Sequence, residues 1–330
     1  MSFAPSIYSY AGDPVVAGSL EAPPNSEASG LTASRRSPGL LWLHDDSGGR
    51  PEIHAVNLKG VLQGKIRLDG ASSGDWEDIA AAEIDGKAYL ILADTGDNDA
   101  KRSKVYLHIL PEPAVGELSP SGSVTVRPSA SLRITYPDGP RDCEAVAVDA
   151  REGAIYLLSK RDETPRLYRV DIPRPLKSGD VTPSFVGEVG NLPQKGMKRS
   201  DGRVLSWPTA MDFSPDGRFA AVLTYTSPVL FERQGSEPWQ DTLARTPTVL
   251  PPHDLPQAES LGFSSDGRSL YVASEKTRNL VRYDLSEYGI AAGWRPTVPL
   301  IVAGVASLTA VTLAVVYRKR IQAALSGQKE

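Results

Sequence analysis

The sequence predicts an all-β fold, a β-propeller of five blades that is closed by its N-terminal strand. Its 29 glycines and 27 prolines among 330 residues suit short strands and tight turns better than long helices. A strand, turn and strand pattern also recurs along the chain, and four-stranded units repeated around an axis form a propeller. Near the C-terminus, a long uncharged segment predicts one transmembrane helix in addition.

Five segments share the repeated pattern of an apolar strand, a turn with glycine and a second apolar strand. They start at residues 27, 77, 144, 209 and 259 and read EASGLTASRRSPGLLWLHDD, EDIAAAEIDGKAYLILADTGDN, EAVAVDAREGAIYLLSKRD, TAMDFSPDGRFAAVLTYTS and ESLGFSSDGRSLYVASEKT. The glycine in each turn supplies the positive φ that such hairpins need. We therefore expect the first two strands of one blade in each segment.

Further strands complete the units. The third strands read EIHAVNL, KVYLHIL, RLYRVDI, PVLFERQ and NLVRYDL, and the fourth strands of the first four units read GKIRLDG, SLRITYP, PSFVGEV and TPTVLP. The fifth unit lacks a fourth strand, so we expect DPVVAGSL, which begins at Asp13, to fill the gap and close the ring. Six blades are the alternative, with the extra blade within residues 100–140 or 160–208.

Two of the turns resemble those of known families. FSPDGR at residues 213–218 and FSSDGR at 263–268 resemble the repeat of TolB-type and WD40-like bacterial propellers. The acidic strand openings, such as DWED at 75–78 and DCE at 142–144, more faintly resemble phytase-like and esterase-like bacterial propellers. The resemblance covers about residues 13–288 and implies the propeller fold, but propellers host many unrelated functions.

The C-terminal segment predicts a membrane anchor. Residues 296–317, PTVPLIVAGVASLTAVTLAVVY, carry no charge and are long enough to cross the roughly 30 Å of a bilayer core. The basic cluster Arg318, Lys319 and Arg320 follows directly and favours a cytoplasmic C-terminus. We expect a propeller at 1–290, a linker at 291–296, a transmembrane helix at 297–317 and a basic cytoplasmic tail at 318–330.

This orientation predicts an extracytoplasmic propeller. Residues 1–20 show neither the basic region nor the apolar region of a signal peptide, so a tail-anchored protein with a cytoplasmic propeller is the alternative. The net charge of −4 offers no basic surface for nucleic acid, and we expect no nucleic-acid partner. The sequence contains no phosphate-binding glycine-rich loop or dinucleotide fingerprint, so we expect no organic cofactor.

Glutamates open four of the five first strands, with a threonine at residue 209 as the fifth. In a propeller, the start of the first strand and the end of the second meet at one mouth of the central channel. Crowded carboxylates repel one another unless a cation or shared protons neutralise them, and Ca²⁺ takes 6 to 8 oxygen ligands. The sequence therefore predicts a calcium site with the ligands Glu27, Glu77, Glu144, Glu259, Asp45 and Asp94.

A second set of side chains, at the ends of the second strands, differs from blade to blade. A site for an asymmetric ligand has this property, whereas a structural position would look alike in every blade. We predict these as ligand-binding residues: Asp46, Asp97, Asn98, Lys160, Tyr225 and Glu275. The alternative is a scaffold in which the glutamates only accept backbone hydrogen bonds.

Together these features predict a membrane-anchored propeller that binds a ligand or a protein partner at an acidic, calcium-occupied channel mouth. The alternative function is a metal-dependent ester or phosphoester hydrolase. For that reaction, His44 beside Asp45 and Asp46 is the candidate for general acid and base. The single cysteine, Cys143, excludes an internal disulfide.

Overall fold

The computed structural model describes residues 12–22, 28–46, 51–70 and 74–288. By its internal contacts the chain divides into two units, Met1–Gly293 and Trp294–Glu330. Glu27, the linker at 291–296, the predicted transmembrane helix at 297–317 and the tail at 318–330 lie outside the described residues. Within the described ranges, no helix combines the length and the apolar character needed to cross a bilayer.

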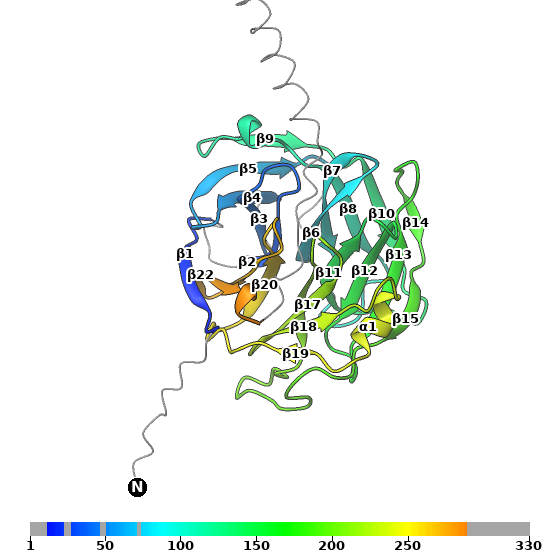
Figure 1. Ribbon diagram of the computed structural model, residues 1–330. Helices are drawn as coiled ribbons and strands as arrows, with labels where there is room; N and C mark the ends of the chain where they lie inside the picture. Colours follow the sequence, from blue (N-terminus) through cyan, green and yellow to red (C-terminus); the bar gives the residue numbers. More distant parts are fainter. Residues whose placement is uncertain (1–11, 23–27, 47–50, 71–73, 289–330) are drawn as a thin grey trace, which may run out of the picture. The chain divides into compact units, whose positions relative to one another are not determined.

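Within those ranges the first unit contains five β-sheets, which are the five predicted blades (Figure 1). From the innermost strand outwards, blade 1 contains β2 (Ala28–Ala33), β3 (Leu40–Asp45), β4 (Glu52–Asn57) and β5 (Leu62–Leu68). Blade 2 contains β6 (Trp76–Ile84), β7 (Lys87–Asp94), β8 (Val105–Pro111) and β10 (Ala130–Ile134). Blade 3 contains β11 (Cys143–Asp149), β12 (Ala154–Ser159), β13 (Arg166–Asp171) and β15 (Ser184–Glu188). Blade 4 contains β16 (Pro208–Phe213), β17 (Phe219–Thr224), β18 (Pro228–Glu232) and the short β19 (Thr248–Val249).

Blade 5 is built from both ends of the first unit. Its strands are β20 (Ala258–Phe263), β21 (Ser269–Ser274), β22 (Thr277–Asp284) and, outermost, β1 (Val15–Ser19), which pairs antiparallel with β22. The Leu20 N–H donates to the Arg278 carbonyl (2.7 Å), while Glu21 accepts a hydrogen bond from the Leu62 N–H of blade 1 (2.9 Å). The predicted closure by the N-terminal strand is therefore confirmed.

The ring has five blades and not six. The innermost strands β2, β6, β11, β16 and β20 contact one another in this order, and β20 contacts β2. The two stretches considered for a sixth blade instead add strands to blades 1, 2 and 3. They include β9 (Ser123–Val126), parallel to β5, and β14 (Gly179–Val181), parallel to β10, which extend blades 1 and 2 to five strands.

The hydrophobic core lies between the blades. Each of five buried clusters joins two neighbouring blades; for example, Ile91 of blade 2 packs with Ile155 of blade 3, and Met211 of blade 4 packs with Tyr156 of blade 3. Inner strands buried on both faces explain the continuous apolar runs in the repeats. The described residues also form three short helices, η1 (Val115–Glu117), α1 (Trp239–Leu243) and η2 (Leu285–Tyr288), which lie in connections between strands or after the last of them.

Turn chemistry accounts for the repeated motifs. All five predicted turn glycines have positive φ, and Asp85 (φ 50°) with Gly86 (φ 73°) forms the two-residue loop between β6 and β7. In FSPDGR the Ser214 hydroxyl donates to Asp216 (2.6 Å) and accepts from the Phe219 N–H (2.9 Å). The FSSDGR turn repeats these bonds, so the motif encodes a hairpin turn.

Two buried aspartates connect the innermost strands across the channel. Asp78 of blade 2 accepts hydrogen bonds from the N–H groups of Ile79 (2.8 Å), Val146 of blade 3 (2.8 Å) and Met211 of blade 4 (3.3 Å). Asp212 of blade 4 accepts from the Phe263 N–H of blade 5 (2.9 Å). Backbone groups on the inner edges are thereby satisfied by side chains.

Replacement Asp78→Asn should destabilise the ring by about 1–3 kcal/mol. The asparagine NH₂ group would take the place of one carboxylate oxygen and would face a backbone N–H group that it cannot accept a hydrogen bond from. Denaturant unfolding of the full chain measures this. The matched control is Asp85→Asn, at an exposed turn position where asparagine tolerates the positive φ, and its effect should stay within about 0.5 kcal/mol. Equal stability of the two variants would contradict the inter-blade role of Asp78.

Candidate functional site

A β-bulge lies near the start of every innermost strand. In all five blades the pairing of the first two strands skips one residue: Ser29, Glu77, Glu144, Thr209 and Glu259. A bulge bends the strand and redirects its side chain. The register assigns Ser29 to this position in blade 1, whereas Glu27, the residue predicted for it, lies outside the described residues.

The bulge residues divide into two kinds. The hydroxyl of Ser29 donates to the Glu77 carbonyl (3.0 Å), and that of Thr209 donates to the Ala258 carbonyl (2.8 Å), so each connects its blade to the next. The glutamates are longer and reach other side chains at the channel mouth. Three of the predicted metal ligands, Glu77, Glu144 and Glu259, therefore occupy equivalent positions in blades 2, 3 and 5.

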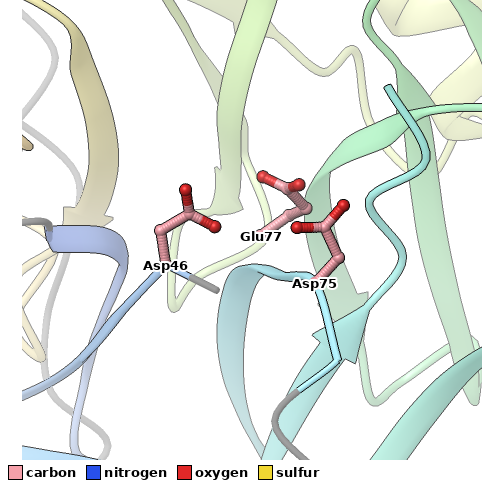
Figure 2. A group of neighbouring side chains, drawn as sticks. All are labelled: Asp46, Asp75 and Glu77. Atoms are coloured by element: carbon pink, nitrogen blue, oxygen red, sulfur yellow. The ribbon is translucent and has the colours of Figure 1, made fainter. Parts of the chain in front are cut away.

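Two groups of carboxylates have the spacing of a metal site, and Glu77 belongs to both. One group is Asp46, Asp75 and Glu77, and the other is Glu77, Asp142 and Glu144; in each, one oxygen per residue lies within 4.8 Å of the others. Figure 2 shows the first group, with Asp46 after β3 facing Asp75 and Glu77 at the start of β6.

The second group is already neutralised by side chains of the protein. The Lys160 ammonium pairs with Glu144 and lies 3.6 Å from Glu259 Oε1. Arg161 Nε lies 2.6 Å from Asp142 Oδ2. The negative charge on this side of the mouth therefore has two built-in counter-ions.

Tyr225 and Glu275 complete this buried network. The Tyr225 hydroxyl donates to Glu259 (2.8 Å), and its ring centroid lies 5.4 Å from the Lys160 ammonium. Burial acts to raise the pKa of Glu259, but Lys160 and the hydrogen bonds from Glu275 and Tyr225 outweigh it and lower this pKa. Burial and the neighbouring Glu259 raise the pKa of Glu275 to about 9. The predicted ligand residues Lys160, Tyr225 and Glu275 thus form one charged cluster.

Glu77 lacks such compensation. Its side chain is 5% exposed, and within the described part of the chain it forms no ion pair within 4 Å, so the charge of Lys160 acts on it only from a greater distance. Burial, and next the charge of Glu144, raise the pKa of Glu77 well above its ordinary value. Burial and then Asp46 likewise raise the pKa of Asp75. A proton or a cation at this position would relieve the repulsion.

The backbone is shaped around these carboxylates. A Cβ at residue 96 would overlap Glu77 Oε1, and one at residue 74 would overlap the carboxylate of Asp94. Gly74 and Gly96 therefore let the loops before β6 and after β7 approach the acidic side chains closely.

The remaining predicted residues near the mouth mainly hold the loop after β7. Asp94 Oδ1 accepts from the Asp75 N–H (3.0 Å) and from Arg102 Nη2 (2.7 Å). The two Asp97 oxygens accept from the N–H groups of Lys101 and Arg102 (2.8 Å each). Asn98 accepts a hydrogen bond from Arg161. The oxygens of Asp97 are thus committed to turn geometry.

His44 lies inside blade 1. It is fully buried, its Nδ1 is 2.8 Å from the Asp45 carbonyl oxygen, and its ring meets that of Trp76 edge-on at 5.8 Å. Burial lowers the pKa of His44 to about 4, so the imidazole is neutral at neutral pH. His44 is therefore a residue of the buried core of blade 1.

Sequence reasoning omitted Asp75, Asp142 and Arg161 from the site. Both aspartates precede a bulge glutamate by two residues, in DWE and DCE, and this spacing was the available signal. Arg161 follows Lys160 directly. Two adjacent cations after β12 were therefore the signal in the sequence that the carboxylates on this side of the mouth have counter-ions.

Comparisons with known proteins add little to this description. No family model and no curated protein matches the chain, so the TolB-type and phytase-like resemblances stay predictions. Among solved structures, a chain in the crystal structure of a nidogen/laminin complex is similar, with a TM-score of 0.43 and 13% identity over 78% of this chain and 76% of that one. The propeller assignment here depends on the strand order and the closed ring.

The buried state of His44 predicts how stability changes with pH. In the unfolded chain a histidine takes up a proton near pH 6.5, whereas folded His44 does so only near pH 4, so the stability that it contributes is lost as the pH falls through this window. His44→Asn does not titrate, and from pH 7 to pH 5 it should lose about 1–2 kcal/mol less unfolding free energy than the native chain. Urea titrations at the two pH values measure this; parallel losses would show that His44 is not buried as a neutral group.

Proposed function

We propose that this protein is a binding propeller that holds one Ca²⁺ ion at Asp46, Asp75 and Glu77 and binds its ligand or protein partner at that channel mouth. The observation that carries the proposal is the Glu77 carboxylate, which is buried, lies beside two further carboxylates and forms no ion pair within 4 Å among the described residues. A charged carboxylate in such a place is unfavourable unless a proton or a cation neutralises it, and a cation shared by three carboxylates neutralises more charge than one proton does.

The spacing suits calcium. Two oxygens bound to the same Ca²⁺ at 2.3–2.6 Å can be at most about 5 Å apart, and the three carboxylates meet this limit. Water or a ligand would supply the remaining oxygens, since Ca²⁺ takes 6 to 8 of them. A bound ion with open positions offers a partner's carboxylate, phosphate or hydroxyl groups a place to attach.

One ion is expected rather than two. Lys160 and Arg161 occupy the neighbourhood of Glu144 and Asp142, so a second dication there would meet two fixed positive charges. The predicted ligands Glu144 and Glu259 then act indirectly, by holding Lys160. Asp94 also acts indirectly: its carboxylate accepts a hydrogen bond from the backbone N–H of Asp75 and so holds Asp75 in place.

Membrane anchoring by residues 297–317, with an extracytoplasmic propeller, belongs to the same proposal. Extracellular calcium modules work with dissociation constants of about 10⁻⁴–10⁻³ M, which a site with three carboxylates can reach. We do not favour the hydrolase, because buried His44, with a pKa of about 4, is poorly suited to move protons at neutral pH.

The test is Glu77→Gln, which keeps the shape and removes the charge. Calorimetric titration of the full chain should give one Ca²⁺ per native chain and at least about tenfold weaker binding in the variant. Because burial disfavours the charged form of Glu77, the calcium-free variant should melt higher than the calcium-free native chain, by about 2–4 °C for each kcal/mol of repulsion removed.

The control is Glu83→Gln, on the same strand but at the exposed end away from the mouth, and it should bind Ca²⁺ like the native chain. A lower melting temperature of Glu77→Gln without calcium would instead indicate a structural hydrogen-bonding role. No heat of binding and no calcium-dependent rise in melting temperature of the native chain would overturn the proposal.

A further inference from the structure

A cavity of about 320 Å³ opens between blade 3 and the segment that leads into blade 4. Val189, Leu192, Val204 and the indole of Trp207 give it an apolar wall, and Arg161 and Lys195 add two cations. Arg161 also forms part of the acidic mouth, so cavity and mouth share one side chain. The volume is within the range of small-molecule sites.

The cavity has a flat wall that is held in place. The Arg161 guanidinium carbon lies 4.9 Å from the Trp207 ring centroid, while its Nε is fixed by Asp142 at 2.6 Å. A cation that stacks on the indole and is held by a buried carboxylate restricts the ring's movement. Trp207 therefore presents a pre-formed aromatic surface.

Two charged side chains of the cavity wall, Lys195 and Glu163, form no ion pair within 4 Å among the described residues. Lys195 Nζ is 3.1 Å from the Thr164 hydroxyl, and among the residues that the structure describes no carboxylate lies within 4 Å of it. Of the acidic side chains in the wall, Asp162 is engaged by Arg141 and by the Ser159 hydroxyl. Glu163, the other, is exposed. A ligand's acidic group would meet Lys195 as a free counter-ion.

We infer that this cavity binds a small organic anion, with a flat apolar body against Trp207 and Leu192 and an acidic group at Lys195. This site uses neither Glu77 nor Asp75, so it stands whether or not the mouth holds calcium. The lining of the cavity indicates the class of ligand. Its apolar wall disfavours a fully hydrated ion such as phosphate, and Lys195 favours an anion over a neutral molecule.

Two fluorescent dyes test the inference on the full chain. Anilinonaphthalene sulfonate carries the flat body and the anionic group, and N-phenylnaphthylamine carries the same body without the charge. Lys195→Gln should weaken binding of the sulfonate about five- to tenfold and leave the neutral dye unchanged. Trp207→Leu should weaken both dyes. EGTA should change neither result, which separates this site from the calcium site.

The control is Lys198→Gln, an exposed lysine of the same segment outside the cavity wall, which should bind both dyes like the native chain. Lys195 is exposed, so its variant tests the inference even where Trp207→Leu disturbs folding. Equal effects of Lys195→Gln and Lys198→Gln, or binding of several dye molecules per chain, would overturn the inference.

Discussion

Each innermost strand has a hydrogen-bonding partner on one side only. Strands β2, β6, β11, β16 and β20 lie at the inner ends of their sheets, so their free edges face the channel in the middle of the ring. Buried N–H and carbonyl groups must still be paired, and here side chains do it: Asp78 and Asp212 accept from the neighbouring blades, and Ser29 and Thr209 donate to them. The fold itself therefore requires polar side chains along the channel, whether or not the channel binds a ligand.

The candidate site consists of the polar side chains at the mouth that do not pair with backbone groups of the inner strands. Bulges bring three glutamates to the mouth, and Lys160 satisfies Glu144 and contacts Glu259, but not Glu77. Among the residues described, Glu77 is thus a buried carboxylate at the mouth that forms no ion pair within 4 Å. Blades 1 and 4 carry a hydroxyl at the same position, and it donates to a carbonyl of the next blade.

Much of the fold was predictable because it is local. Apolar strands around an Asp-Gly or similar turn pair with their sequence neighbours. The position of the N-terminal strand was predictable because the fifth repeat lacked a fourth strand of its own. The added strands β9 and β14 were not predictable, because they join blades 1 and 2 from distant segments with little apolar character.

The site was predictable only in outline. Glu77 and Glu144 were found from the repeat, but the repeat alone cannot show which of them lies beside Lys160, since that depends on the reach of a side chain across the channel. The bulge position of blade 1 was not predictable from residue types either. Glutamate was matched to glutamate, while the backbone register places a serine at that bulge.

The closure by β1 also has a consequence for biosynthesis. Val15 pairs with Arg282, so β1 has its partner only after more than 260 further residues are made. At about 5–20 residues per second this takes on the order of ten to fifty seconds. During that time the edge of β1 is open to pairing with other chains, and its Val15 and Val16 are 49% and 62% exposed even in the finished ring. Blade 5 is therefore completed only late in synthesis, and β1 needs protection until then.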